Sequence, residues 1–292
     1  MNYRHAFHAG NFADVVKHLT LARVIDYLRR KAAPFRFIDT HAGIGLYDLA
    51  GEAGARSPEW QKGIARLYDG PGFTRLADAK SEVGSLLAPY LDIVEAVNRE
   101  KGADRLRYYP GAGEIARRMM RADDRIVVNE LHPTDARLLR EQMARDRRVV
   151  TMEIDGWTAV KSLLPPKERR GVVLIDPPFE QAGDFKRLEA ALEAAHSRFD
   201  CGIVMLWYPI KAGAEAGQLT NRIGRGVIRR LLAVELTVRH REQPGGLNGS
   251  GLIIRNPPFG LDKELEVLLP WLQTRLGEAV GSRAQAQWLV GE

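Results

Sequence analysis

Buried strands that end on an acid are the feature that most limits how this chain can fold. Residues 172–175 are apolar and mostly β-branched, which is typical of a strand covered on both faces. Asp176, Pro177, Pro178 and Phe179 follow, and because prolines cannot continue a central strand the chain has to leave the sheet there. We therefore predict a parallel sheet with Asp176 at its carboxyl edge, where open α/β sheets bind ligands.

Three other predicted strands end in the same way. Asp39 closes a strand over 35–39, Glu130 one over 125–130, and Asp155 one over 149–155. A single acid at this place is commonly a helix N-cap. Four in a parallel sheet lie along one edge, at the mouth of one cleft, which favours a ligand site.

A row of carboxylates repels phosphates but suits a ligand with hydroxyls, amines or positive charge. S-adenosylmethionine has a ribose, an adenine, an ammonium and a sulfonium, and it carries no phosphate. A nicotinamide cofactor fits poorly because of its pyrophosphate. The glycine pattern also argues against a nicotinamide cofactor. Gly43 and Gly45 are followed by Asp48 where the dinucleotide fingerprint requires a third glycine.

The Asp176 turn also suits an amine on a flat ring. The carboxylate and a backbone carbonyl accept two N–H bonds, and Phe179 offers a stacking face. The alternative is an ordinary turn with an aromatic residue beside it.

Composition sets broader limits. The chain of 292 residues is 45% hydrophobic and 27% charged, with a formal net charge of +6, which favours a polyanionic partner. The lone Cys201, expected in the core, excludes an internal disulfide, and the seven histidines show no metal-ligand spacing. With no signal core and no apolar run of about 18–20 residues, we expect a cytoplasmic monomer that binds no metal and no membrane.

Residues 51–107 interrupt the alternation of strands and helices. We read them as a helical insertion without strands, between a first part over 1–50 and a remainder over 108–292. Beyond residue 202 we expect three more strands, near 203–207, 231–239 and 251–255. We also expect an arginine-rich helix from Arg222 to Arg230 and a mobile loop over 243–250.

Several motifs carry a resemblance to a known family. Asp39-Thr40-His41-Ala42-Gly43 resembles the first motif of S-adenosylmethionine-dependent methyltransferases, and Asp176-Pro177-Pro178-Phe179 the signature of those that methylate amines. The whole chain looks like the RlmJ-type 23S ribosomal RNA adenine-N6 methyltransferases. The matching segments are Tyr3-Arg4-His5-Ala6-Phe7-His8-Ala9-Gly10-Asn11, Arg107-Tyr108-Tyr109-Pro110-Gly111, Glu130-Leu131-His132-Pro133, Leu206-Trp207-Tyr208-Pro209 and Trp288-Leu289-Val290.

This resemblance implies a Rossmann-like class I methyltransferase fold: seven strands, mostly parallel, the last one antiparallel, and a small helical insertion after the first. It implies 23S ribosomal RNA as partner and S-adenosylmethionine as cofactor. Carried over by position, it makes Asp176 catalytic and places Tyr3, Pro177 and Phe179 at the substrate base. The cofactor pocket it implies is lined by His18, His41, Ala112, Glu130, Asp155 and Gly156. Ala112 departs from the family, which has serine there, so only a backbone contact can persist.

A second tetrapeptide, Asn256-Pro257-Pro258-Phe259, also fits the signature. In the implied fold the last strand is antiparallel, which places Asn256 at the opposite edge, so we favour Asp176. Two rival functions remain: a DNA adenine-N6 methyltransferase, which the absence of a recognisable DNA-reading domain disfavours, and an RNA-binding protein that keeps the fold without catalysis.

Overall fold

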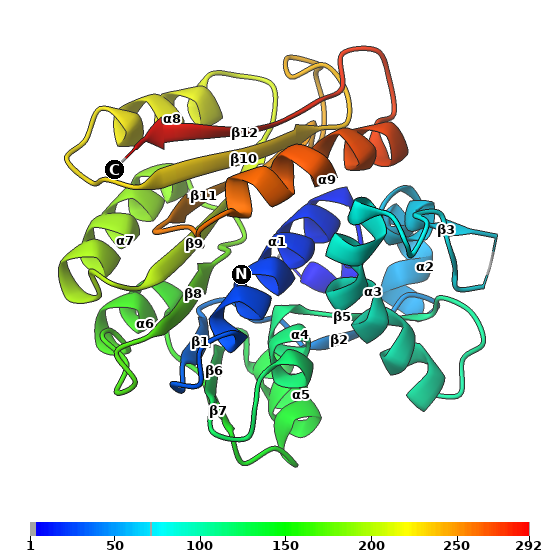
Figure 1. Cartoon of the computed structure of the whole chain (residues 1–292), viewed down its shortest axis with the longest axis horizontal. Coiled ribbons are helices and arrows are strands. Elements are labelled where there is room, and N and C mark those ends of the chain that lie inside the picture. The colour runs from blue at the N-terminus through cyan, green and yellow to red at the C-terminus, as the bar shows by residue number, and fades with distance from the viewer. Residues whose placement is uncertain (1–3, 71, 292) are drawn as a thin grey trace.

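A twisted eight-stranded sheet forms the centre of the computed structural model, which describes residues 4–70 and 72–291. Tyr3 lies outside the described residues. The strand order is β12-β10-β11-β9-β8-β1-β6-β7 (Figure 1). The strands are β1 (Arg36–Asp39), β6 (Arg125–Asn129), β7 (Val149–Met152), β8 (Gly171–Ile175), β9 (Ile203–Ile210), β10 (Leu231–Thr237), β11 (Gly249–Arg255) and β12 (Arg283–Val290).

Strand direction agrees with the Rossmann-like prediction in its central part. β7, β6, β1, β8 and β9 are parallel neighbours, and β11 is antiparallel to both β9 and β10. The predicted number of seven strands is wrong, because β12 adds an antiparallel edge strand beside β10. Side chains along β12 are largely exposed, so this strand lacks the apolar run that marks the buried ones.

Helices cover both faces of the sheet (Figure 1). On one face lie α1 (Phe12–Arg29), α4 (Ala112–Met119), α5 (Pro133–Met143) and α9 (Leu261–Leu276). On the other lie α6 (Gly156–Ser162), α7 (Asp184–Arg198) and α8 (Glu215–Gly224). Two apolar layers therefore enclose the sheet, as the continuously apolar strands require. None of the helices described has the combined length and apolar character that crossing a membrane needs.

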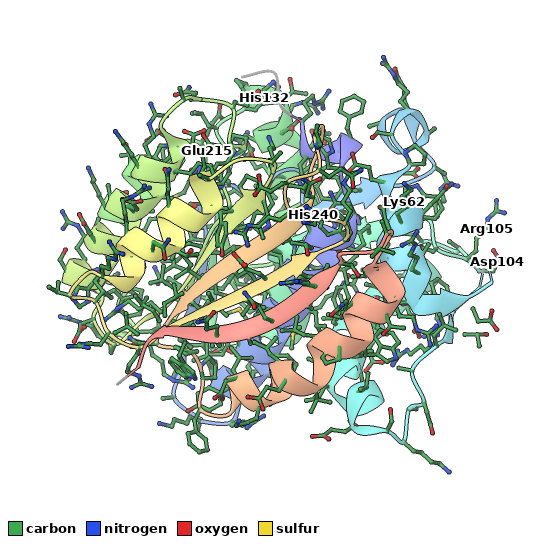
Figure 2. All side chains as sticks on the ribbon, turned by 90° about the horizontal axis from the view of Figure 1, so that it is seen from above. Lys62, Asp104, Arg105, His132, Glu215 and His240 are labelled. Atoms are coloured by element: carbon green, nitrogen blue, oxygen red, sulfur yellow. The ribbon has the colours of Figure 1, made fainter. Side chains whose placement is uncertain are left out.

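The segment between β1 and β6 is mainly helical. The insertion predicted over 51–107 nevertheless contains one short strand pair, at 68–69 and 74–75, which corrects the prediction that it has no strands. It contains α2 (Glu52–Arg56), α3 (Glu82–Glu100), and two 3-10 turns, Glu59–Lys62 and Ile64–Leu67. Two short antiparallel pairs join them: β3 (Tyr68–Asp69) with β4 (Thr74–Arg75), and β2 (Leu46–Asp48) with β5 (Tyr108–Pro110). Figure 2 shows Lys62, Asp104 and Arg105 on the side of the molecule that this segment forms.

Two further expectations are wrong, and the loop expected to be mobile is anchored at its carboxyl end. The arginine-rich segment is helical only to Gly224, and Arg230 pairs with Gly291 at the amino end of β10, away from the carboxyl edge. Cys201 is exposed. The loop over 243–250 is held by Asn248, a fully buried side chain whose amide donates to the carbonyls of Arg241 and Gln243.

Candidate functional site

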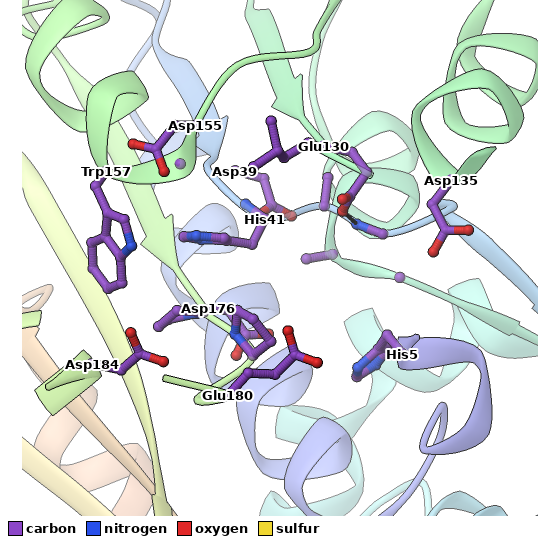
Figure 3. A pocket seen from close by; sticks show the side chains of 18 of the residues that line it. His5, Asp39, His41, Glu130, Asp135, Asp155, Trp157, Asp176, Glu180 and Asp184 are labelled. Atoms are coloured by element: carbon purple, nitrogen blue, oxygen red, sulfur yellow. Dashed lines mark hydrogen bonds between the residues drawn. The ribbon is translucent and has the colours of Figure 1, made fainter. Parts of the chain in front are cut away.

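A cavity of about 350 Å³ opens at the carboxyl edge of the parallel strands. Figure 3 shows its acids on several elements: Glu130 and Asp135 stand on one side and Asp155 on the other, while Asp176 and Glu180 lie below them in this view. Four of these acids close or follow strands of the sheet: Asp39, Glu130, Asp155 and Asp176. Asp135 lies in the first turn of α5, and Asp184 begins α7. The volume lies in the range of small-molecule sites.

The structure brings eight of the ten predicted site residues to this cavity. They are His18, His41, Ala112, Glu130, Asp155, Gly156, Asp176 and Pro177. Phe179 is not part of its lining, and Tyr3 lies outside the described residues. The second tetrapeptide lies where it was expected: the Asn256 side chain donates to the carbonyls of Asp200 and Gly202, just before the amino end of β9, so it stands at the edge opposite the cavity.

Asp176 is joined to a buried lysine that sequence reasoning missed. Lys17, only 4% exposed, places its Nζ 2.5 Å from Asp176 Oδ2 and 2.8 Å from Asp14 Oδ1. Burial opposes its charge, but the two carboxylates outweigh that effect and raise the pKa of Lys17. A cation so placed holds Asp176 in one orientation at the cavity wall.

A signal for Lys17 was present in the sequence. Nearly the whole of α1 is buried, although Asp14, Lys17 and His18 interrupt its apolar stripe. Positions three and four apart share one helix face, so Asp14, Lys17 and His18 form a polar group on a helix otherwise suited to the core. Buried charges need partners, and the sequence does not reveal that Asp176 is one of them.

His18 is held neutral by its surroundings. Its Nδ1 lies 2.8 Å from the Tyr109 hydroxyl, which lies 2.9 Å from that of Tyr90. Burial lowers the pKa of His18 to about 3, against the opposing effect of Asp14. The ring therefore acts as a neutral hydrogen-bonding group at the cavity wall near neutral pH.

His41 is likewise neutral and close to Gly156. Burial lowers its pKa to about 4, and its ring meets Trp157 edge-on at 5.6 Å between centroids. A side chain at residue 156 would place its Cβ 2.2 Å from His41 Nε2, so glycine is needed there for the ring to fit. Trp157, a further lining residue, was not predicted.

Glu130 and Asp155 are oriented by backbone amides. Glu130 accepts from the amides of Gly43 and His132 at 2.9 and 2.8 Å, and burial raises its pKa. Asp155 does not close β7, which ends at Met152. It caps α6 instead, accepting from the Thr158 amide at 2.8 Å. The helix-cap alternative is therefore correct for Asp155, although the residue still lines the cavity.

Ala112 begins α4, so its amide has no acceptor within the helix. The residue is 5% exposed and lines the cavity. This placement is compatible with the backbone contact expected at this position.

The lining holds seven acids, with Lys17 and Arg187 as its cations. The acids are Asp39, Glu130, Asp135, Asp155, Asp176, Glu180 and Asp184. Such a cavity favours ligands that offer hydrogen-bond donors or positive charge.

Asp39 gives the site a measurable pH signature. Burial, with help from Asp176 and Glu130, raises the pKa of Asp39 from 3.8 to about 7. The folded state then binds more protons than the unfolded state between these values, so stability falls as pH rises through this window. From pH 5 to pH 8 the Asp39 contribution to the free energy of unfolding falls by about 2–3 kcal/mol. Urea unfolding of Asp39→Asn should lack this part of the fall, and equal pH dependence in both proteins would contradict the assignment.

Comparison with known proteins agrees with the family resemblance of the sequence motifs. Residues 32–290 match the family model described as "Ribosomal RNA large subunit methyltransferase D, RlmJ". The chain is 37% identical to "Ribosomal RNA large subunit methyltransferase J" of Escherichia coli and 36% identical to the protein of that name from Haemophilus influenzae, each over the full length of both chains. Among solved structures, protein LPL1258 from Legionella pneumophila is 31% identical with a TM-score of 0.84, covering 96% of this chain and 98% of that one. With its strand-end acids and the Asp176 turn at one cavity, this chain belongs to the RlmJ family of large-subunit ribosomal RNA methyltransferases.

Proposed function

We propose that this protein transfers a methyl group from S-adenosylmethionine to N6 of an adenine in 23S ribosomal RNA. One observation carries the proposal: in a chain of the RlmJ family, Asp176 and Pro177 line the same cavity as the cofactor candidates Glu130 and Asp155. The turn proposed to bind the amine is thus adjacent to the residues proposed to hold the ribose and adenine of the cofactor.

The cavity residues fit S-adenosylmethionine. The Glu130 carboxylate, held by two backbone amides, would accept from the ribose hydroxyls. Asp155 and Gly156 would lie beside the adenine, with Trp157 as an aromatic neighbour. When bound, the cofactor supplies an electrophilic methyl group on a sulfonium.

Asp176 and Pro177 act on the target amine. N6 is a poor nucleophile because its lone pair is delocalised into the adenine ring. If Asp176 Oδ1 and the Pro177 carbonyl accept its two N–H bonds, electron density at the nitrogen rises as the new bond forms. Lys17 engages Oδ2 and leaves Oδ1 for the substrate. The remaining acceleration comes from alignment of the reacting groups.

The target adenine has to leave its stack or come from an unpaired position to reach this turn. Arg230 stands at the opposite edge of the sheet, so it is not placed to hold RNA over this turn.

Mass spectrometric mapping of N6-methyladenine tests the function. Unmodified 23S ribosomal RNA, incubated with the protein and labelled S-adenosylmethionine, should gain the label at one adenine. Genomic DNA in a parallel reaction should gain none. Labelled DNA and unlabelled RNA would favour the DNA methyltransferase, and no label in either would favour the non-catalytic RNA-binding protein.

A Glu130→Gln variant tests the cofactor assignment. The amide keeps only one oxygen, so it cannot accept from both Gly43 and His132, and it loses the charge that strengthens its bonds to hydroxyls. Loss of a hydrogen bond to a charged group costs about 1.5–3 kcal/mol, so KM for S-adenosylmethionine should rise roughly 10- to 100-fold with kcat little changed. Glu153→Gln is the matched control, since Glu153 pairs with Arg140 and does not line the cavity. An equal effect of both substitutions would reject this role for Glu130.

A further inference from the structure

A second, smaller cavity lies on the far side of the Asp176 turn. Its volume is about 120 Å³, and its lining includes Phe179, Phe185, Lys211 and Ala216. Gln181 lines both this cavity and the larger one. Because Phe179 is three residues from Asp176, their Cα atoms are at most about 11 Å apart. The two cavities are therefore neighbours along the rim of the cleft.

The backbone at Phe179 directs its ring towards this second cavity. Phe179 has φ of +52°, in the left-handed region that non-glycine residues rarely adopt. Such a conformation costs on the order of 1–3 kcal/mol and persists where the surrounding structure imposes it. The Phe179 ring packs against Phe185 at 4.9 Å and Trp207 at 5.7 Å between centroids. The aromatic residue of the signature thus lines a site beside the methyl-transfer cavity.

The chemistry of this lining suits an unpaired nucleobase with its phosphate. Phe179 and Phe185 are both half-buried, so their rings keep exposed surface for stacking. Among the residues described, the Lys211 ammonium has no hydrogen bond or ion pair, so its charge is available to a phosphate. Glu215 adds an acceptor for donors on a base edge.

We propose that this second cavity binds the base of a nucleotide next to the target adenine. The inference rests on the proposed function, because it assumes an RNA strand with its target base at Asp176. An adenine withdrawn from its stack leaves its neighbours unstacked, and an aromatic site beside the turn compensates for that loss. The flanking base is then held while the target base reaches Pro177.

Two opposite changes to the cavity test this. Phe185→Ala removes a stacking face, and Ala216→Leu fills the space from α8, where Ala216 is buried. Each should raise KM for unmodified 23S ribosomal RNA about 10-fold, since stacking on an aromatic residue is worth about 1–3 kcal/mol per base. The dissociation constant of S-adenosylmethionine, measured by calorimetry, should stay unchanged. Phe185→Tyr keeps the ring and should behave as the parent protein.

Phe259→Ala is the matched control, because this aromatic is the last residue of the second tetrapeptide, at the opposite edge, and is 89% exposed. It should leave KM for RNA unchanged. An equal rise of KM in Phe259→Ala and Phe185→Ala would overturn the proposal.

RNA with an abasic nucleotide on either side of the mapped adenine, introduced by ligation of a synthetic segment, completes the experiment. One of the two abasic RNAs should raise KM of the parent protein about 10-fold yet cause little further loss in Phe185→Ala, because protein and RNA changes remove the same contact. Effects that multiply, or a parent protein indifferent to both abasic positions, would overturn the proposal. The proposal would also be overturned if Phe185→Ala lowered kcat at saturating RNA and left KM unchanged, because the cavity would then serve the target adenine itself. No methylation of intact RNA by the parent protein would instead reject the proposed function and this inference with it.

Discussion

Replacing Asp176 by alanine is expected to lower kcat for methylation by about 10²- to 10³-fold while S-adenosylmethionine still binds. The carboxylate is a preorganised acceptor for the developing charge on the amine, and removing one such partner costs about 10²–10³ in rate. The variant should fold, because Lys17 keeps its ion pair with Asp14. Single-turnover rates and calorimetric titration of the cofactor measure the two quantities separately.

Asp176→Asn is the informative companion. Its amide oxygen still accepts one N–H bond but is a very weak base. If Asp176 mainly orients the amine, this variant should keep at least tenfold more activity than Asp176→Ala. Equal inactivity of the two variants would identify proton acceptance as the role of Asp176, and undiminished turnover in Asp176→Ala would reject the assignment altogether.

Replacing Lys17 by methionine is expected to have the second largest effect. The substitution leaves the buried carboxylate of Asp14 and that of Asp176 without their shared cation. Removing one partner of a buried ion pair costs about 3–5 kcal/mol of stability. Because Asp176 also loses its anchor, kcat should fall about 100-fold, the usual result of misplacing a reacting group by about 1 Å. Urea unfolding and initial rates at a temperature where the variant is folded measure both effects.

A double variant separates stability from positioning. Asp14→Asn combined with Lys17→Met removes a charge of each sign and should recover much of the lost stability. It should not recover the rate, because Asp176 still lacks its partner. Recovery of both would show that Lys17 serves only the fold. Lys17→Arg, which keeps the charge, should retain more activity than Lys17→Met.

Much of the fold could be predicted because its signals are local. Strands such as Val172–Ile175 are apolar over their whole length, and a parallel sheet covered on both faces requires this. The edge strand β12 was missed because it is exposed along much of its length, and the two-residue strands β3 and β4 are too short for any periodicity to appear.

The site was predicted in part for the same reason. Strand ends identified Asp39, Glu130 and Asp176. The carboxyl ends of parallel strands lie at one edge of the sheet, so these three residues share that edge whatever the conformation of the loops that follow. Asp155 was found for a partly wrong reason, since it caps α6 after the strand has already ended. The His18 assignment came from family resemblance, and only the structure shows that Tyr109 holds its ring.

The sequence by itself therefore determined the sheet, its acid-lined edge and the Asp176 turn, since strand burial and chain exit depend on neighbouring residues. Only the tertiary structure decided which groups meet at that turn. Lys17 reaches Asp176 across 159 positions because α1 packs against β8. The direction of Phe179 depends on a left-handed backbone that its neighbours impose, and no pattern of residue types specifies it. The turn is thus a local motif whose chemistry depends on contacts between residues far apart in the chain.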